Sequence, residues 1–293
     1  MENRERVLSI SLILHLVLSL LSGAVISVSE GLTDNGQAIK LLSLVLVIAG
    51  YAFPIFLYCK KTGFVPFVSP LNAPCMSQNG VSAKEKTFLF LFGISLTVAV
   101  LNVVGQLTDA LFSVFGQTVA NDTSVLQAGT LYSFIKTVCL AALVEEILFR
   151  GAILHAFSDR RNGTRIVISA AAFALMHGNI RQFFYAFAAG LIIATFTVMT
   201  GSLSFSVLLH FGSNLVTFIF SLLKERFDGK TYTWVSLITI SVFVIVAALC
   251  AVWWFLKMRE KGKAPVKTEE GRYPIALPIY LLAAAAISVI GSF

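Results

Sequence analysis

Long apolar segments separated by short polar loops run along the whole chain. A helix needs about 20 mainly apolar residues to cross a bilayer, and most of these segments reach that length without interruption. A transmembrane β-barrel would instead show short segments of alternating polarity. The pattern therefore predicts an all-α, polytopic transmembrane helical bundle with eight to nine spans. The apolar segments lie at residues 7–28, 38–58, 87–107, 131–154, 166–177, 183–200, 203–223, 234–256 and 275–290.

Composition supports a membrane protein. Hydrophobic residues make up 57% of the 293-residue chain and charged residues 13%, whereas soluble domains average about 25% charged. We expect a multi-pass protein of the cell membrane, forming one integral-membrane domain over 1–293 with a catalytic core at about 131–223. The first apolar segment could also be interpreted as a cleaved signal peptide. Its length and the lack of an A-x-A cleavage site favour a retained helix instead.

The net charge of +7 does not indicate nucleic acid, because the basic residues gather in a few loops, as membrane orientation requires. The positive-inside rule places the amino terminus, the loop 60–86, the turn 160–165 and a basic linker at 257–273 in the cytoplasm. The linker also suits contact with anionic lipid. This topology places the basic loop 224–230 on the external side of the membrane. Either the rule is overridden there or one of the predicted spans is wrong.

Glu145, Glu146 and Arg150 lie inside the apolar segment 131–154. Charges in a membrane are costly, so they usually face a bundle interior or a wet cavity. Glu146 and Arg150 are four residues apart, share a helix face and can pair. Glu145 lies about 100° around the helix and is free for another role. The plain alternative is that the Glu–Arg pair only holds two helices together.

Three more polar side chains lie in later apolar segments: His177, His210 and Asn214. His210 and Asn214 are four residues apart and share one helix face. At about 1.5 Å per residue, Glu145, His177 and His210 each lie roughly 14–18 Å from a turn at one end of their helix. If these turns are on the same side, the three side chains converge on one buried pocket.

Such a pocket suits hydrolysis. A carboxylate and a neutral histidine can deprotonate a water, while a second histidine and an amide can donate hydrogen bonds to an oxyanion. The alternative is a zinc ion held by Glu145, His177 and His210, with water in the fourth position.

The three motifs Glu145-Glu146-x-x-x-Arg150, Phe173-x-x-x-His177 and His210-x-x-x-Asn214, in this order, resemble the CAAX protease and bacteriocin-processing family, also called the Abi family. The resemblance covers about 131–223. It implies an integral-membrane endopeptidase with about eight helices. In that family's terms, Glu145 and His177 activate the water, His210 and Asn214 form the oxyanion site, and Glu146 and Arg150 support the geometry.

We therefore predict an intramembrane endopeptidase that cleaves membrane-associated, lipidated or peptide substrates. The alternative is a non-catalytic membrane scaffold or a bacteriocin self-immunity protein, because family members with both roles exist. No cofactor is favoured, because an amide such as Asn214 is a poor zinc ligand and few polar groups stand ready to orient metal-bound histidines. Zinc on Glu145, His177 and His210 stays possible. The expected partners are a peptide or membrane-protein substrate and the lipid bilayer.

Overall fold

The computed structural model describes residues 2–33, 35–69, 71, 83–114 and 129–261. Within these ranges the regular structure is entirely helical, which confirms the predicted all-α class. The final apolar segment, 275–290, and most of the basic linker 257–273 lie outside the described residues; residues 257–261 form the end of the last helix. The elements are α1 (Glu2–Leu32), α2 (Gly36–Thr62), α3 (Ala83–Val114), α5 (Thr130–Ser133), η1 (Phe134–Leu140), α6 (Ala141–Glu146), η2 (Ile147–Ala152), α7 (Ile153–Ala156), α8 (Asn162–Leu175), α9 (Ile180–Thr200), α10 (Leu203–Arg226) and α11 (Gly229–Lys261).

Six described helices are long and apolar enough to cross a membrane: α1, α2, α3, α9, α10 and α11. The predicted count of eight to nine spans is therefore not confirmed. Two predicted spans account for much of the difference. The 14 residues of α8 rise only roughly 21 Å, less than the ~30 Å of a hydrocarbon core. The segment 131–154 is helical throughout but is divided by two π-helical stretches, η1 and η2.

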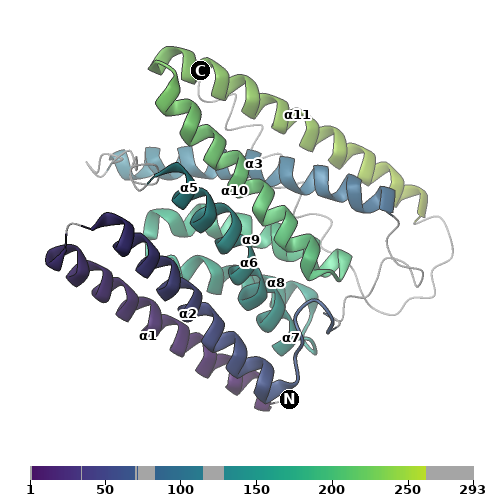
Figure 1. Ribbon diagram of the computed structural model, residues 1–293. Helices are drawn as coiled ribbons and strands as arrows, with labels where there is room; N and C mark the ends of the chain where they lie inside the picture. Colours follow the sequence, from purple (N-terminus) through teal and green to yellow (C-terminus); the bar gives the residue numbers. More distant parts are fainter. Residues whose placement is uncertain (1, 34, 70, 72–82, 115–128, 262–293) are drawn as a thin grey trace.

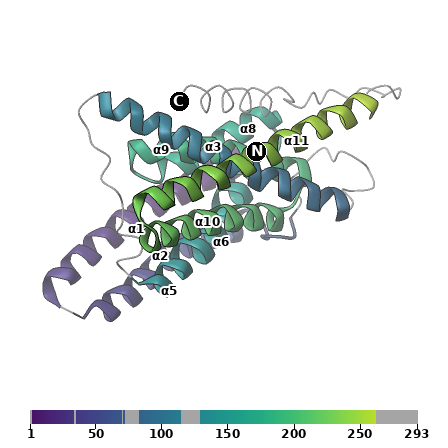
Figure 2. The same ribbon diagram turned by 90° about the horizontal axis from the view of Figure 1, so that it is seen from above.

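The continuous helix from α5 through η1, α6 and η2 to α7, here called the motif helix, lies in the middle of the bundle (Figure 1). On one side of it lies the hairpin of α1 and α2. On the other side, α10 packs against the motif helix, and α3 and α11 lie beyond (Figure 1). Viewed from above, the turn that joins α1 to α2 projects beyond the other helices (Figure 2). The helices α8 and α9 pack against one another and complete the core around the motif helix.

The two π-helical stretches have carbonyl oxygens that bond to side chains of other helices. In η1, the Thr137 carbonyl accepts a hydrogen bond from Asn214 Nδ2 of α10 at 2.7 Å. In η2, the Phe149 carbonyl accepts one from the buried Ser169 hydroxyl of α8 at 2.8 Å. A π-helical stretch disturbs the regular i→i−4 bonding and is frequent at functional sites. Both stretches are thus fixed by the helices that carry the other motifs.

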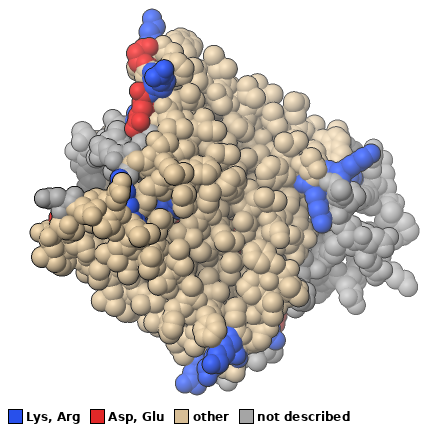
Figure 3. Space-filling view, viewed as in Figure 1, with Lys and Arg blue, Asp and Glu red and all other residues tan. Residues whose placement is uncertain are grey.

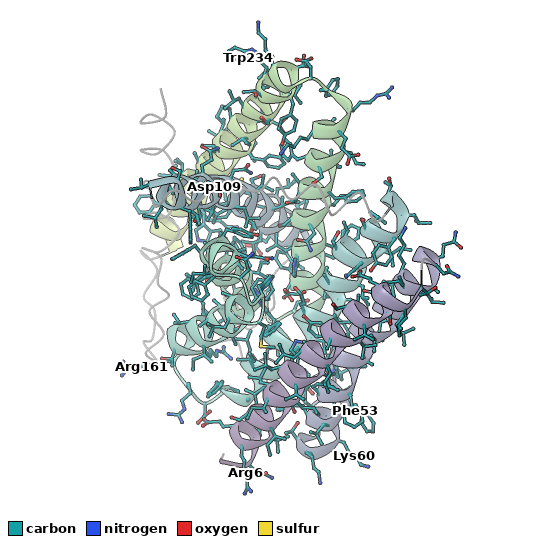
Figure 4. The ribbon with its side chains drawn as sticks, turned by 90° about the vertical axis from the view of Figure 1, so that its left-hand side faces the viewer. Arg6, Phe53, Lys60, Asp109, Arg161 and Trp234 are labelled. Carbon is teal, nitrogen blue, oxygen red and sulfur yellow. The ribbon has the colours of Figure 1, made fainter. Side chains whose placement is uncertain are left out.

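Charged side chains gather at the edges of the molecule, and a broad uncharged surface lies between them (Figure 3). Arg6, Lys60 and Arg161 lie at one end, and Trp234 lies at the other (Figure 4). At the first end, Arg160 pairs with Glu5 at 3.0 Å, which ties the turn after the motif helix to α1. The surface suits a bilayer, and three of the segments predicted to be cytoplasmic share one end.

The basic loop between α10 and α11 joins two helices that are both long and apolar enough to cross a membrane. It lies at the end of the bundle opposite Arg6, near Trp234 (Figure 4). Asp228 begins α11 by accepting hydrogen bonds from the Thr231 hydroxyl and from the backbone N–H groups of Lys230 and Thr231. These bonds hold the pKa of Asp228 below its usual value. The turn is therefore well defined, and it lies at the end of the bundle to which the predicted topology assigns it (Figure 4).

Candidate active site

The most buried part of the site is an ion pair joined by a histidine. Arg150 Nη1 donates to Glu146 Oε1 at 2.8 Å, and both side chains are 0% exposed. His210 Nδ1 lies 2.8 Å from the same carboxylate oxygen. The Arg150–Glu146 pairing expected from their spacing is therefore present, and it connects the motif helix to α10. Glu146 holds His210 in place, a contact that helix spacing alone did not reveal.

Glu145 points away from this ion pair and is 17% exposed. The Tyr51 hydroxyl of α2 donates to its Oε1 at 3.4 Å, and its Oε2 lies 3.9 Å from His210 Nε2. A separation of that size between polar atoms suits a bridging water. The two adjacent glutamates thus differ in surroundings: Glu146 is held by Arg150 and His210, while Glu145 keeps access to the outside of the bundle.

Phe173 is the ring around which the site packs. The Arg150 guanidinium carbon lies 4.4 Å from its centroid, and the rings of His177 and His210 meet it edge-on at 4.8 and 5.7 Å. Guanidinium groups are attracted to aromatic faces. One buried phenylalanine of α8 therefore contacts a residue of each of the three motifs.

Both histidines are fixed in the same tautomer. His177 Nδ1 lies 2.7 Å from the Phe173 carbonyl, which can only accept, so Nδ1 carries the hydrogen. His210 Nδ1 faces the Glu146 carboxylate, which already pairs with Arg150, so the same assignment holds there. In a neutral imidazole the other nitrogen is then an acceptor. Each histidine therefore offers Nε2 as a proton acceptor.

Asn214 lies one turn beyond His210 on α10 and is half-buried. One of its amide N–H groups is donated to the Thr137 carbonyl. An amide has two such donors, so a second hydrogen bond to a substrate oxygen stays open to it. The structure thus orients Asn214 through the π-helical stretch η1.

Two atoms of the ion pair lack a partner among the described residues: Glu146 Oε2 and Arg150 Nε are buried without a hydrogen bond. Such groups are rare in folded proteins and each calls for a reason. Here they lie in the same cluster as the motif residues.

The ligands suggested for zinc do not form a metal site in this arrangement. In the described ranges, no three His, Cys, Asp or Glu side chains lie close enough to hold a metal ion. Glu145 and His210 are near one another, whereas His177 is held by its own helix through Phe173.

In a comparison with known families, residues 127–216 match the Rce1-like family. Its description is type II CAAX prenyl endopeptidase Rce1-like. The similarity covers less than half of the 293-residue chain. All three motifs lie inside this Rce1-like segment, so the family expected from them is confirmed there. A comparison with curated proteins gives no match, and neither does one with solved structures.

The Rce1-like segment supports a membrane endopeptidase of the CAAX type, and the six apolar helices support an integral membrane protein. The match gives no support to a role in bacteriocin immunity. The matched segment does not include α1, α2 or α3, which lie before residue 127.

Sequence reasoning assigned no role to Tyr51 or Phe173. Phe173 belongs to a quoted motif, but only the fold shows that its ring contacts Arg150, His177 and His210. Tyr51 is a polar-tipped residue in the second apolar segment, a weak signal that nothing in the sequence connects to Glu145.

Proposed function

We propose that this protein is an intramembrane endopeptidase in which Glu145 and His177 activate a water and His210 and Asn214 stabilise the oxyanion. The observation that carries the proposal is the difference between the two glutamates. Glu146 is bound by Arg150 and His210, while Glu145 is partly exposed and its Oε2 lies 3.9 Å from His210 Nε2. A buried structural pair needs only one carboxylate. The second carboxylate is therefore available for chemistry.

Peptide hydrolysis proceeds as follows in this proposal. A water gives a proton to the Glu145 carboxylate or to His177 Nε2, and its oxygen bonds to the scissile carbonyl carbon. The carbonyl oxygen becomes an oxyanion that accepts from the second Asn214 N–H and from His210, whose Nε2 takes a proton from solvent before the reaction and keeps it throughout. The C–N bond then breaks, and the leaving amine takes a proton from the group that removed it from water.

The geometry of the ion pair suits a role of Glu146 and Arg150 in positioning His210. By holding His210 Nδ1, Glu146 directs Nε2 towards Glu145. Arg150 balances the charge of Glu146 and also lies 3.5 Å from the Gly190 carbonyl of α9. Groups held rigidly in this way need little reorganisation during the reaction.

The test is a comparison of membrane peptides from cells that produce the wild-type protein or Glu145→Gln. The amide keeps the shape of the side chain but cannot accept the proton. We expect peptides with new termini in the wild type and their loss in Glu145→Gln at equal protein abundance. The matched control is Glu225→Gln, an exposed glutamate at the far end of α10, which should leave the products unchanged. Identical peptide sets for wild type and Glu145→Gln would overturn the enzyme and favour a scaffold.

A further inference from the structure

The helix α2 runs parallel to the motif helix, and polar side chains bridge the two along their length. From one end to the other, the contacts are Ser43 to Lys136 at 3.4 Å, Tyr51 to Glu145 at 3.4 Å and Tyr58 to His155 at 2.9 Å. Close approach of the two backbones is concentrated at α6 and η2. Towards η1 and α5, long side chains bridge the helices instead. This seam is the side from which Tyr51 reaches the partly exposed Glu145.

Two lysines lie in this seam. Lys136 of η1 is half-buried, donates to Ser43 and lies 5.6 Å from the Tyr132 ring centroid. Lys40 of α2 reaches the start of the motif helix, since a Cβ at Gly129 would lie 3.7 Å from its Nζ. Figure 3 shows basic side chains set back in a hollow on the face where the outer part of α2 lies near α5 in Figure 1.

These lysines have no carboxylate partner among the described residues: the ion pairs found there involve other groups. Lysines within membrane helices are costly and usually pair with an anion or mark a substrate path. Lys136 points sideways to α2 and is not simply extended beyond the end of its helix. An anion supplied from outside the chain would complete the arrangement.

We propose that Lys136, with Lys40 beside the same seam, binds a carboxylate of the peptide substrate, either an acidic side chain or a free carboxy terminus. The inference rests on the proposed function, because it places the substrate along the seam with its scissile bond at Glu145. An ammonium group and a carboxylate form a charge-assisted hydrogen bond. This contact selects acidic, otherwise apolar peptides.

The spacing fixes where the carboxylate lies in the substrate. From Lys136 to Glu145 the motif helix rises roughly 13 Å at ~1.5 Å per residue. An extended peptide covers this distance with about four residues at ~3.3 Å each. The acidic group therefore lies about four residues from the bond that is cut.

The first experiment measures selectivity. Purified full-length protein in detergent is given a mixture of apolar peptides that carry Asp, Asn or Lys at each position, each with a free or an amidated carboxy terminus. Cleavage is followed by mass spectrometry. We expect roughly tenfold higher kcat/KM, through KM, for a carboxylate about four residues from the cut, the size of one hydrogen bond to a charged group.

The variants assign that preference to Lys136. Lys136→Met should cleave acidic and neutral peptides equally, Lys136→Arg should keep the preference, and Lys136→Glu should favour the peptides that carry Lys. The matched control is Lys60→Met, an exposed lysine near the other end of α2, which should keep the wild-type preference. A wild type without acidic preference, or Lys136→Met that retains it, overturns the inference.

A binding measurement separates this inference from the proposed function. In the Glu145→Gln background, fluorescence anisotropy compares a labelled apolar peptide with its carboxy-terminal amide. Tighter binding of the carboxylate peptide, lost with Lys136→Met, supports the subsite even if the wild type cleaves nothing. The absence of cleavage would overturn only the proposed protease function. Cleavage without a preference for the carboxylate would overturn only the subsite. Phosphatidylglycerol binding that depends on Lys136, without any peptide preference, assigns the lysines to lipid and overturns the inference.

Discussion

At the residue scale, adjacent glutamates on one helix have separate surroundings because successive side chains of a helix point about 100° apart. Glu146 faces the interior, where Arg150 and His210 meet it, and Glu145 faces the seam with α2. This difference makes the consequences of their substitution different.

Arg150→Ala should reduce the amount and stability of the protein. It leaves the Glu146 carboxylate buried without its cation, and breaking a buried pair in this way costs about 3–5 kcal/mol. Thermal unfolding of the purified protein measures the loss. The double variant Glu146→Gln with Arg150→Gln should recover part of it, because no unpaired charge remains. A double variant no more stable than Arg150→Ala would contradict this explanation.

Tyr51→Phe should lower kcat about three- to tenfold with little change in KM. The substitution removes the hydrogen bond to Glu145 Oε1, and such a bond contributes about 0.5–1.5 kcal/mol. The ring and its contact with His15 at 4.1 Å stay, so thermal stability should be nearly unchanged. Tyr232→Phe on α11 serves as the control. An equal loss of activity in both variants would argue against a role for Tyr51 in holding Glu145.

Exhaustive chelation should leave cleavage unaffected, and elemental analysis should find less than one zinc per chain. The expectation follows from Asn214, which is a poor ligand but a good oxyanion donor, and from the proposal that Glu145 and His177 activate the water. If the protein contains one zinc per chain, loses activity when the zinc is removed and regains activity when zinc is added back, it is a metalloprotease.

At the element scale, the site depends on the close approach of α8 to α9. A Cβ on Gly190 would lie 3.0 Å from the Ala170 Cα, a backbone atom that cannot move aside. Small residues permit such approaches between membrane helices. The Gly190 carbonyl also lies 3.5 Å from Arg150 Nη2, so this approach places α9 against the buried ion pair.

Gly190→Ala should therefore lower stability by about 1–3 kcal/mol, as overpacking does in a tight core. The control is Gly105→Ala on α3, where a Cβ meets nothing within 4 Å. This control should be neutral or slightly more stable, because alanine favours helix. Equal unfolding temperatures for the two variants would show that α8 and α9 can separate freely.

At the scale of the whole molecule, the fold defines one end of the bundle by contacts between distant segments. Arg4 donates to the Ser158 hydroxyl at 3.3 Å and Arg160 pairs with Glu5. The amino terminus and the turn after the motif helix therefore lie on the same side of the membrane, which the positive-inside rule assigns to the cytoplasm.

Ser158→Cys, in a variant without the native cysteines, should resist an impermeant thiol reagent in intact cells and react in inverted vesicles. Lys230→Cys, exposed in the first turn of α11, is the matched control and should react from outside. Labelling of Ser158→Cys in intact cells would invert the predicted orientation.

The sequence by itself determined the helical class, the approximate limits of the described helices and the motif residues. It could do so because apolar length and i,i+4 spacing are local properties that need no neighbour. It placed Glu146 with Arg150 for the same reason. Its count of eight to nine spans is not confirmed, because α8 is short and two π-helical stretches divide the motif helix, features that hydropathy does not register.

Only the tertiary structure decided which side chains meet across helices. That His210 joins both glutamates, that Phe173 packs against three motif residues and that Tyr51 reaches Glu145 are contacts between segments far apart in the chain. Spacing along a helix predicts which face of that helix a residue lies on. It does not predict the rotation and depth of the neighbouring helix. These are set by packing between helices, such as that of Ala170 on Gly190. The contact of Lys136 with Ser43 likewise exists only once α2 is placed beside the motif helix.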